Sequence, residues 1–335
     1  MMRRRWLLGL TLLLSMVVGA QGQAGATMSE FVSYTAEGAG LSIDALGVRT
    51  NRIGTLDVQL PAGASVYKAY LYSASVWRYG LHNVEFEGNT MVSNASSRLD
   101  IGSKDANPAA ENRWDVTSIV SSKVGGGSGL FHFSTRELGY LDGEILAVLY
   151  EVPSAPVSTA MIFDGELASS GDSFKINLAK PIDKTDPNFQ ATMSLGISFG
   201  YQPGGQYTEV DVNGKRLTSS AGGQDDGYDS NGGLITAGGI GDSVTNPPDP
   251  YSHGTGPRYD DELYDLSAFV SNGDTVINIA TRNPSNNDNI FFMGFTTLGK
   301  AYVGPGPAVP EPTSLILLGT GLMGMMGVRQ KKRKV

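Results

Sequence analysis

The chain has 335 residues, with 25 lysines and arginines against 33 aspartates and glutamates, a formal net charge of −8, and no cysteine. Eight of the basic residues lie within 1–26 and 329–335, so residues 27–328 carry a net charge of −16 and repel nucleic acid and anionic lipid. The lack of cysteine excludes disulfides, thiolate zinc sites, a cysteine nucleophile and a lipoprotein anchor, so a buried core must stabilise the protein.

The first 26 residues have the pattern of a secretory signal peptide. Arg3–Arg5 form a basic start, Trp6–Val18 an apolar segment, and Ala24-Gly25-Ala26 a small-residue cleavage site, with Val18-Gly19-Ala20 as a second option. The alternative is an uncleaved N-terminal anchor, which the small residues disfavour. We therefore expect residues 1–26 to be removed by signal peptidase during export.

Short β-rich runs follow, separated by turns rich in Gly, Ser, Asn and Asp. The runs that serve as examples are Val66–Tyr72, Leu130–Phe133, Thr192–Ser198 and Val276–Ile279. Alternation of apolar and polar residues between turns is typical of half-buried antiparallel strands. The sequence therefore predicts an all-β protein with antiparallel β-sandwich architecture.

Five matches in the same order indicate an internal duplication. The matched pairs are Leu56–Leu60 with Phe174–Leu178, Val84–Gly88 with Val210–Gly214, Trp114–Ser121 with Tyr264–Ser271, Phe131–Arg136 with Ile277–Arg282, and Asp142–Val148 with Asp288–Phe292. We expect tandem repeats at 27–155 and 156–303, followed by a C-terminal segment at 304–335. The two repeats form either separate domains or one continuous sandwich.

One element of the repeat predicts a short helix. Asp115 and Asp265 each precede an apolar pattern that suits a single helical turn, at 115–120 and 265–270. An aspartate carboxylate caps such a turn, and the apolar residues one and four positions later share a buried face.

Two hairpin and strand segments carry a family resemblance. Val212–Lys215 and Ser271–Ile279, together with the capped turns, resemble the galactose-binding-like jelly rolls that accompany many glycoside hydrolases. These are turn and core residues, so the resemblance implies a jelly-roll-like fold and does not imply sugar binding. Leu146–Pro153 also resembles uncharacterised modules of bacterial surface proteins.

Trp77 and Tyr79 are the candidate glycan-binding residues. They follow a predicted strand, where two aromatic rings offer a platform for a sugar ring. The alternative is burial of the tryptophan at the strand end.

A candidate calcium site lies in the long interval between 219 and 262, which is rich in Gly, Asp and Pro. Oxygen ligands near a glycine turn suit calcium. The candidate ligands are Asp225, Asp226, Asp229 and Asn231. The pattern departs from the known calcium loop because Gly227 occupies a ligand position, so solvated turn carboxylates are the alternative.

Catalytic motifs are absent from the sequence. His82, His132 and His253 lie far apart, and no H-x-x-x-H or G-x-S-x-G pattern occurs. A glycosidase with paired carboxylates stays open as an alternative, because such pairs meet only in the folded protein.

The C-terminus places Pro310-Glu311-Pro312 before an apolar segment, Leu315–Val328, which is shorter than the ~20 residues of a full membrane span. A basic stop follows, formed by Arg329, Lys331, Lys332, Arg333 and Lys334. This order resembles the PEP-CTERM sorting signal of Gram-negative bacteria that make exopolysaccharide; an ordinary anchor helix is the alternative. The resemblance implies transient anchoring in the inner membrane, cleavage by an exosortase-type protease, and transfer to the cell surface.

These features together favour a non-enzymatic protein of the cell surface or extracellular matrix, associated with exopolysaccharide or biofilm. A glycan-binding module and a secreted hydrolase are the alternatives. We expect no nucleic-acid partner and no cofactor other than calcium.

Overall fold

A computed structural model describes residues 28–47, 53–75, 82–99, 110–165, 167, 171–198, 208–219, 221, 235–246, 262–283 and 290–304. In these ranges no helix is long and apolar enough to cross a membrane. The predicted signal peptide, the apolar segment before the basic stop, and the sorting motif lie outside the described residues. The all-β prediction is confirmed, because antiparallel sheets make up most of the described chain.

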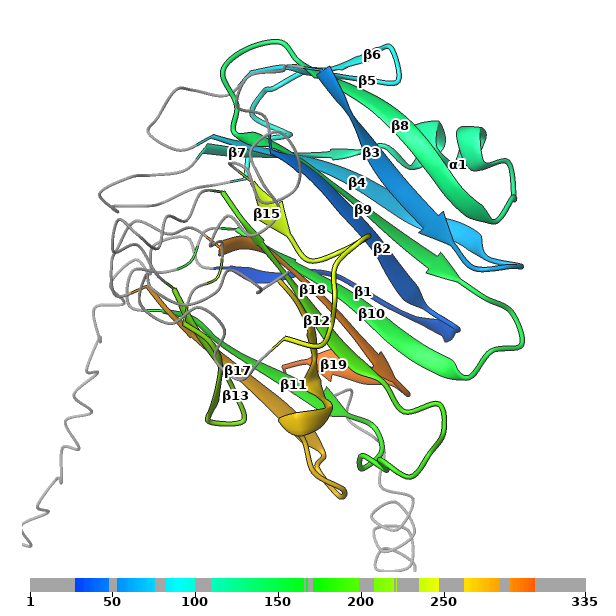
Figure 1. Ribbon diagram of the computed structural model, residues 1–335, viewed down its shortest axis with the longest axis vertical. Helices are drawn as coiled ribbons and strands as arrows, with labels where there is room; N and C mark the ends of the chain where they lie inside the picture. The colour runs from blue at the N-terminus through cyan, green and yellow to red at the C-terminus, as the bar shows by residue number, and fades with distance from the viewer. Residues whose placement is uncertain are drawn as a thin grey trace, which may run out of the picture.

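Four sheets stack into one pile (Figure 1). Sheet I contains β3 (Ile53–Leu60), β8 (Gly129–Glu137), β5 (Val84–Phe86) and β6 (Asn89–Met91). Sheet II contains β2 (Gly40–Gly47), β9 (Gly143–Glu151), β4 (Ser65–Ser75) and β7 (Ala110–Asp115). Sheet III contains β1 (Ser29–Glu37), β10 (Val157–Asp164), β18 (Ile290–Leu298), β12 (Ala191–Ile197), β15 (Thr236–Ala237) and β16 (Leu263–Asp265). Sheet IV contains β14 (Lys215–Thr218), β13 (Glu209–Val212), β17 (Val276–Arg282), β11 (Ser173–Leu178) and β19 (Ala301–Val303).

Three hydrophobic cores separate the four sheets. The first core lies between sheets I and II and includes Phe86 and Phe133. The last core lies between sheets III and IV and includes Phe163 and Phe295. The middle core, which includes Phe292, joins sheets II and III. The chain thus forms two sandwiches that are themselves packed face to face.

The position of a sheet in the pile decides how its strands are buried. In the outer sheets, β8 and β17 alternate between buried and exposed residues, as the sequence pattern predicts. In the inner sheets the prediction of half-buried strands is wrong: seven consecutive residues of β4, 69–75, are buried, and β12 is buried at six of its seven residues. Both faces of an inner sheet contact a core, so alternate residues enter different cores and the whole run is apolar or small.

The two sandwiches repeat one order of strands. The β5–β6 hairpin pairs with β8 and then β3, and the β13–β14 hairpin pairs with β17 and then β11. Both hairpins turn through two residues of positive φ, Glu87-Gly88 and Asn213-Gly214, as the twist of a two-residue hairpin requires. β1 departs from this order, because it pairs with β10 in sheet III although it precedes every strand of sheets I and II.

Short helices follow both aspartates of the repeat. α1 (Thr117–Val124) is longer than the single turn predicted, and η3 (Leu266–Ala268) is one 3₁₀ turn. Asp265 is the N-cap of η3, as predicted, and its Oδ1 accepts the Ser267 N–H at 2.8 Å. The prediction that Asp115 caps α1 is wrong, because the N-cap of α1 is Val116, which makes no side-chain cap bond. Asp115 stands one residue earlier, and its Oδ1 accepts the Thr117 N–H at 2.9 Å. Val116 and Leu266 are fully buried against their respective cores.

Replacement of Asp265 tests the contribution of this cap. We expect Asp265→Ala to lower the free energy of unfolding by about 1 kcal/mol, because the Ser267 N–H loses its acceptor. Asp265→Asn keeps a side-chain oxygen and should remain close to the wild type in urea denaturation at pH 7. An equal loss in both variants would assign the effect to the charge and contradict the capping role.

Candidate functional site

All the site residues predicted from the sequence lie outside the described residues. They are Trp77 and Tyr79; Asp225, Asp226, Asp229 and Asn231; Pro310, Glu311 and Pro312; and Arg329, Lys331, Lys332, Arg333 and Lys334. The glycan and calcium predictions remain predictions.

Acidic side chains in the described ranges do not form a metal site. No group of three or more histidine, aspartate or glutamate side chains converges there. His132 is exposed on β8, with Nδ1 2.6 Å from Asp57 Oδ1. Glu144 is fully buried at the start of β9. Burial is the main cause that raises its pKa well above the ordinary value, and the charge of Glu137 adds to the effect. A carboxyl group held neutral in this way is a poor ligand for a cation.

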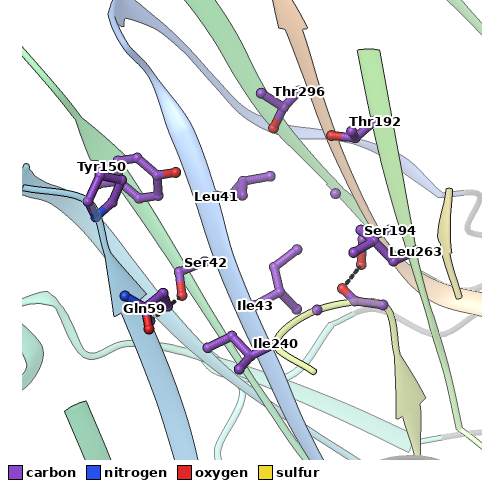
Figure 2. A pocket seen from close by; sticks show the side chains of 14 residues that line it. Leu41, Ser42, Ile43, Gln59, Tyr150, Thr192, Ser194, Ile240, Leu263 and Thr296 are labelled. Carbon is purple, nitrogen blue, oxygen red and sulfur yellow. Dashed lines mark hydrogen bonds between the residues drawn. The ribbon is translucent and has the colours of Figure 1, made fainter. Parts of the chain in front are cut away.

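A groove along the side of the pile is the feature with the geometry of a binding site. Sheet II packs over sheet III only as far as β2, its edge strand, and the groove lies at that edge (Figure 2). One section is a cavity of about 370 Å³, and the neighbouring section is a cavity of about 500 Å³. Five residues line both sections, so we treat them as one seam groove: Leu41, Pro61, Tyr150, Thr192 and Thr296.

The floor of the seam groove is built from small and hydroxylated residues of sheet III. Thr192 lies directly opposite Thr296 on β12 and β18, and Ser194 lies opposite Gly294. Side chains of β2 cover Gly294, because a Cβ atom there would stand 2.8 Å from Ile43 and 3.2 Å from Leu41, and the Ser194 hydroxyl donates to the Gly238 carbonyl. Thr192 and Thr296 are only half-buried, and their hydroxyls have no hydrogen-bond partner among the described groups.

Tyr150 forms one wall of the seam groove. Its ring lies over Gly40 on the neighbouring strand, where a Cβ atom would stand 2.5 Å from the ring. The hydroxyl is turned toward the cavity in Figure 2. Burial raises the pKa of Tyr150 above its ordinary value, so the group remains a neutral hydroxyl that can donate and accept.

The edge of β2 adds backbone groups to the same wall. The carbonyl oxygen of Ile43 accepts the Ile240 N–H at 2.9 Å, on the side of β2 away from β9. Because every second residue of a strand turns its N–H and C=O to the same side, the peptide groups of Leu41 also face away from β9. They have no partner among the described residues and are available to a bound molecule.

The seam groove carries no charged side chain. Of all the residues that line its two sections, only Tyr150 is titratable. Sequence reasoning missed this site, although one signal is present: Thr192, Ser194, Gly294 and Thr296 interrupt strands whose other residues are mostly apolar. The position of Tyr150 against them depends on pairing between distant strands, which the sequence pattern does not reveal.

Comparison with known proteins identifies the end of the chain. Residues 308–334 match the PEP-CTERM protein-sorting motif. The C-terminus is a PEP-CTERM sorting signal. The prediction made from Pro310-Glu311-Pro312 and the basic stop is therefore confirmed, and the signal indicates an exported protein that an exosortase sorts to the cell envelope or surface.

The comparisons do not identify the rest of the chain. The major capsid protein P2 from bacteriophage PM2 aligns with 78% of this chain and 98% of its own, at 11% identity and a TM-score of 0.20, a likeness that supports no argument. No curated protein matches the chain at a significant level. The resemblance of the body to galactose-binding-like jelly rolls and bacterial surface modules stays a prediction.

Proposed function

We propose that this protein is a non-enzymatic component of the cell surface or extracellular matrix, associated with exopolysaccharide. The sorting signal at 308–334 carries the proposal, because it directs the chain to the cell envelope. The acidic body supports it, since a net negative charge keeps an exported protein soluble and separate from anionic polymers. A secreted hydrolase has less support, because the seam groove holds no carboxylate pair and no histidine.

The two ends of the described chain lie at one corner of the pile. β1 starts at Ser29 on the edge of sheet III, and β19 ends at Val303 on the edge of sheet IV. The backbone N–H of Val303 donates to the Glu30 carboxylate. The predicted signal peptide and the sorting signal therefore connect to the body at the same corner of the second sandwich.

This corner supports an orientation for the anchored precursor. Five residues separate Gly304 from Pro310, and the six Cα-to-Cα steps between them span at most ~20 Å in an extended chain. A membrane protease that acts at the motif would hold Gly304, at this corner of the second sandwich, within about that distance of the bilayer. Sheets I and II would then lie farther from the membrane, and the seam groove would remain open at the side of the pile.

The sorting step is tested by replacing the two prolines of the motif. We expect Pro310→Ala with Pro312→Ala to keep the tail and to accumulate in the membrane fraction, because the protease loses its recognition motif. Pro305→Ala with Pro307→Ala is the matched control and should reach the surface without the tail. Mass spectrometry of both fractions measures the outcome. A peptide containing Arg329–Val335 in the wild-type surface fraction would rule the proposal out.

A further inference from the structure

We propose that the seam groove binds a stretch of neutral polysaccharide. The inference rests on the proposed function, which places the protein at the cell surface together with exopolysaccharide, and it adds the site and the class of polymer. It depends on three properties of the groove: its lack of charge, its unpaired hydroxyl and peptide groups, and its aromatic wall.

Charge selects the class of polymer. The body carries a net charge of −16, whereas the lining of the seam groove is uncharged along both sections. A polymer of uronic acids or phosphates would be repelled during approach and would find no cation to pair with. The negative charge of the protein does not oppose the approach of a neutral polysaccharide.

Hydrogen-bonding groups in the groove match the groups on a sugar. The hydroxyls of Thr192, Thr296 and Tyr150 both donate and accept, as sugar hydroxyls do. The Leu41 peptide adds one donor and one acceptor. A ligand that displaced water without replacing its hydrogen bonds would lose about 1–3 kcal/mol for each buried group. A polyhydroxylated ligand is able to replace them.

Aromatic and small residues give the groove the shape for a ring. Gly40 leaves room for the Tyr150 ring, because a Cβ atom at this position would stand 2.5 Å from it. Phe189, together with Tyr150, lines the second section, so apolar ring surface is present for the C–H faces of successive sugars. The volumes of the two sections fall within the ~300–1,000 Å³ typical of ligand sites.

An extended peptide fits less well. A strand added to β2 would need a row of free backbone groups along its edge. The Ile43 carbonyl already accepts the Ile240 N–H, and the Ala39 carbonyl accepts the Ser158 hydroxyl at 2.6 Å. Only the Leu41 peptide between them is free, which is too little for strand addition.

The test uses the full mature body, without signal peptide or tail, and a defined panel. The panel contains maltohexaose, cellohexaose, laminarihexaose, mannohexaose, the neutral fraction of the producing cell's exopolysaccharide, and polygalacturonate as the acidic member. Calorimetry with the wild type should detect binding of at least one neutral member and none of polygalacturonate. Thr192→Val with Thr296→Val keeps the shape, removes both hydroxyls, and should weaken that binding at least tenfold. Tyr150→Phe should weaken it about fivefold.

Matched variants outside the groove separate binding from folding. Thr90→Val lies on the exposed edge strand β6, and Tyr140→Phe lies on an exposed turn of the first sandwich. Both should bind like the wild type, and all variants should share its melting temperature within a few degrees. Failure of every neutral member to bind, equal binding by the threonine double variant, or preference for polygalacturonate would each overturn the inference. None of these results depends on sorting, so they are distinguishable from failure of the proposed function.

Discussion

Phe292→Ala should lower the free energy of unfolding by about 3–5 kcal/mol, because a large aromatic side chain leaves a cavity in a core that cannot collapse around it. Phe292 is fully buried on β18 in the middle core. Its ring meets Tyr72 of β4 edge to face, with centroids 5.2 Å apart. The substitution thus removes contacts that join the two sandwiches.

The same variant also reports whether the pile unfolds as one unit. A polar cluster reinforces the middle core: Tyr72 donates to Asp164 at 2.9 Å, and Arg113 ion-pairs with Asp164 while lying over the Phe31 ring. These contacts link sheets II and III, so we expect a single unfolding transition in the wild type.

Urea denaturation followed by fluorescence and by circular dichroism measures both effects. Leu130→Ala, on the exposed face of β8, is the control and should change stability by less than about 0.5 kcal/mol. Two separate transitions, of which Phe292→Ala shifts only one, would show that the middle core does not couple the sandwiches.

Local signals explain which parts of this fold could be predicted. The alternation in Leu130–Phe133 and Val276–Ile279 reflects strands with one solvent-exposed face, and the structure places both in outer sheets. Asp265 caps η3 through a backbone N–H two residues away, so its role can be predicted from neighbouring residues. The sorting signal is likewise contained in one short segment.

Long-range pairing explains what could not be predicted. A run such as Ile145–Leu149 is buried on both sides because a second sandwich packs on sheet II, and nothing near it in the chain shows this. β1 joins β10 across more than a hundred residues. The seam groove combines Tyr150 with Thr192 and Thr296, three residues that meet only after both sandwiches have formed.

Asp44→Asn should stabilise the protein at pH 8 and leave it nearly unchanged at pH 4. Asp44 lies on β2 at the flank of the pile, and its Oδ2 accepts the Asp57 N–H at 2.6 Å. The pKa of Asp44 is raised to about 7, chiefly by burial; the charge of Asp57 acts in the same direction, and the hydrogen bonds from the backbone oppose both. Burial of Glu144 raises the pKa of that carboxyl in the same direction.

The sign of the pH effect follows from these pKa values. The folded-state pKa of Asp44 lies above the unfolded value of 3.8, so the folded protein binds the proton more tightly. The stability gained from that proton is complete below pH 4 and is lost as the pH rises through 7. A displacement of about three pKa units corresponds to at most about 4 kcal/mol, so we expect Asp44→Asn to gain on the order of 2–4 kcal/mol at pH 8. Asparagine is neutral throughout, and its side-chain oxygen still accepts the Asp57 N–H.

Urea denaturation at pH 4, 6 and 8 checks the size and the sign. Asp183→Asn is the matched control, because hydrogen bonds from Thr185 lower the pKa of the exposed Asp183. It should give no stabilisation at pH 8. The gain from Asp44→Asn should grow between pH 4 and pH 8, since only the wild type must ionise a buried carboxyl over that range. A gain of equal size at every pH would mean that Asp44 is ionised in the folded protein throughout, and that solvent at the flank of β2 reaches its carboxylate.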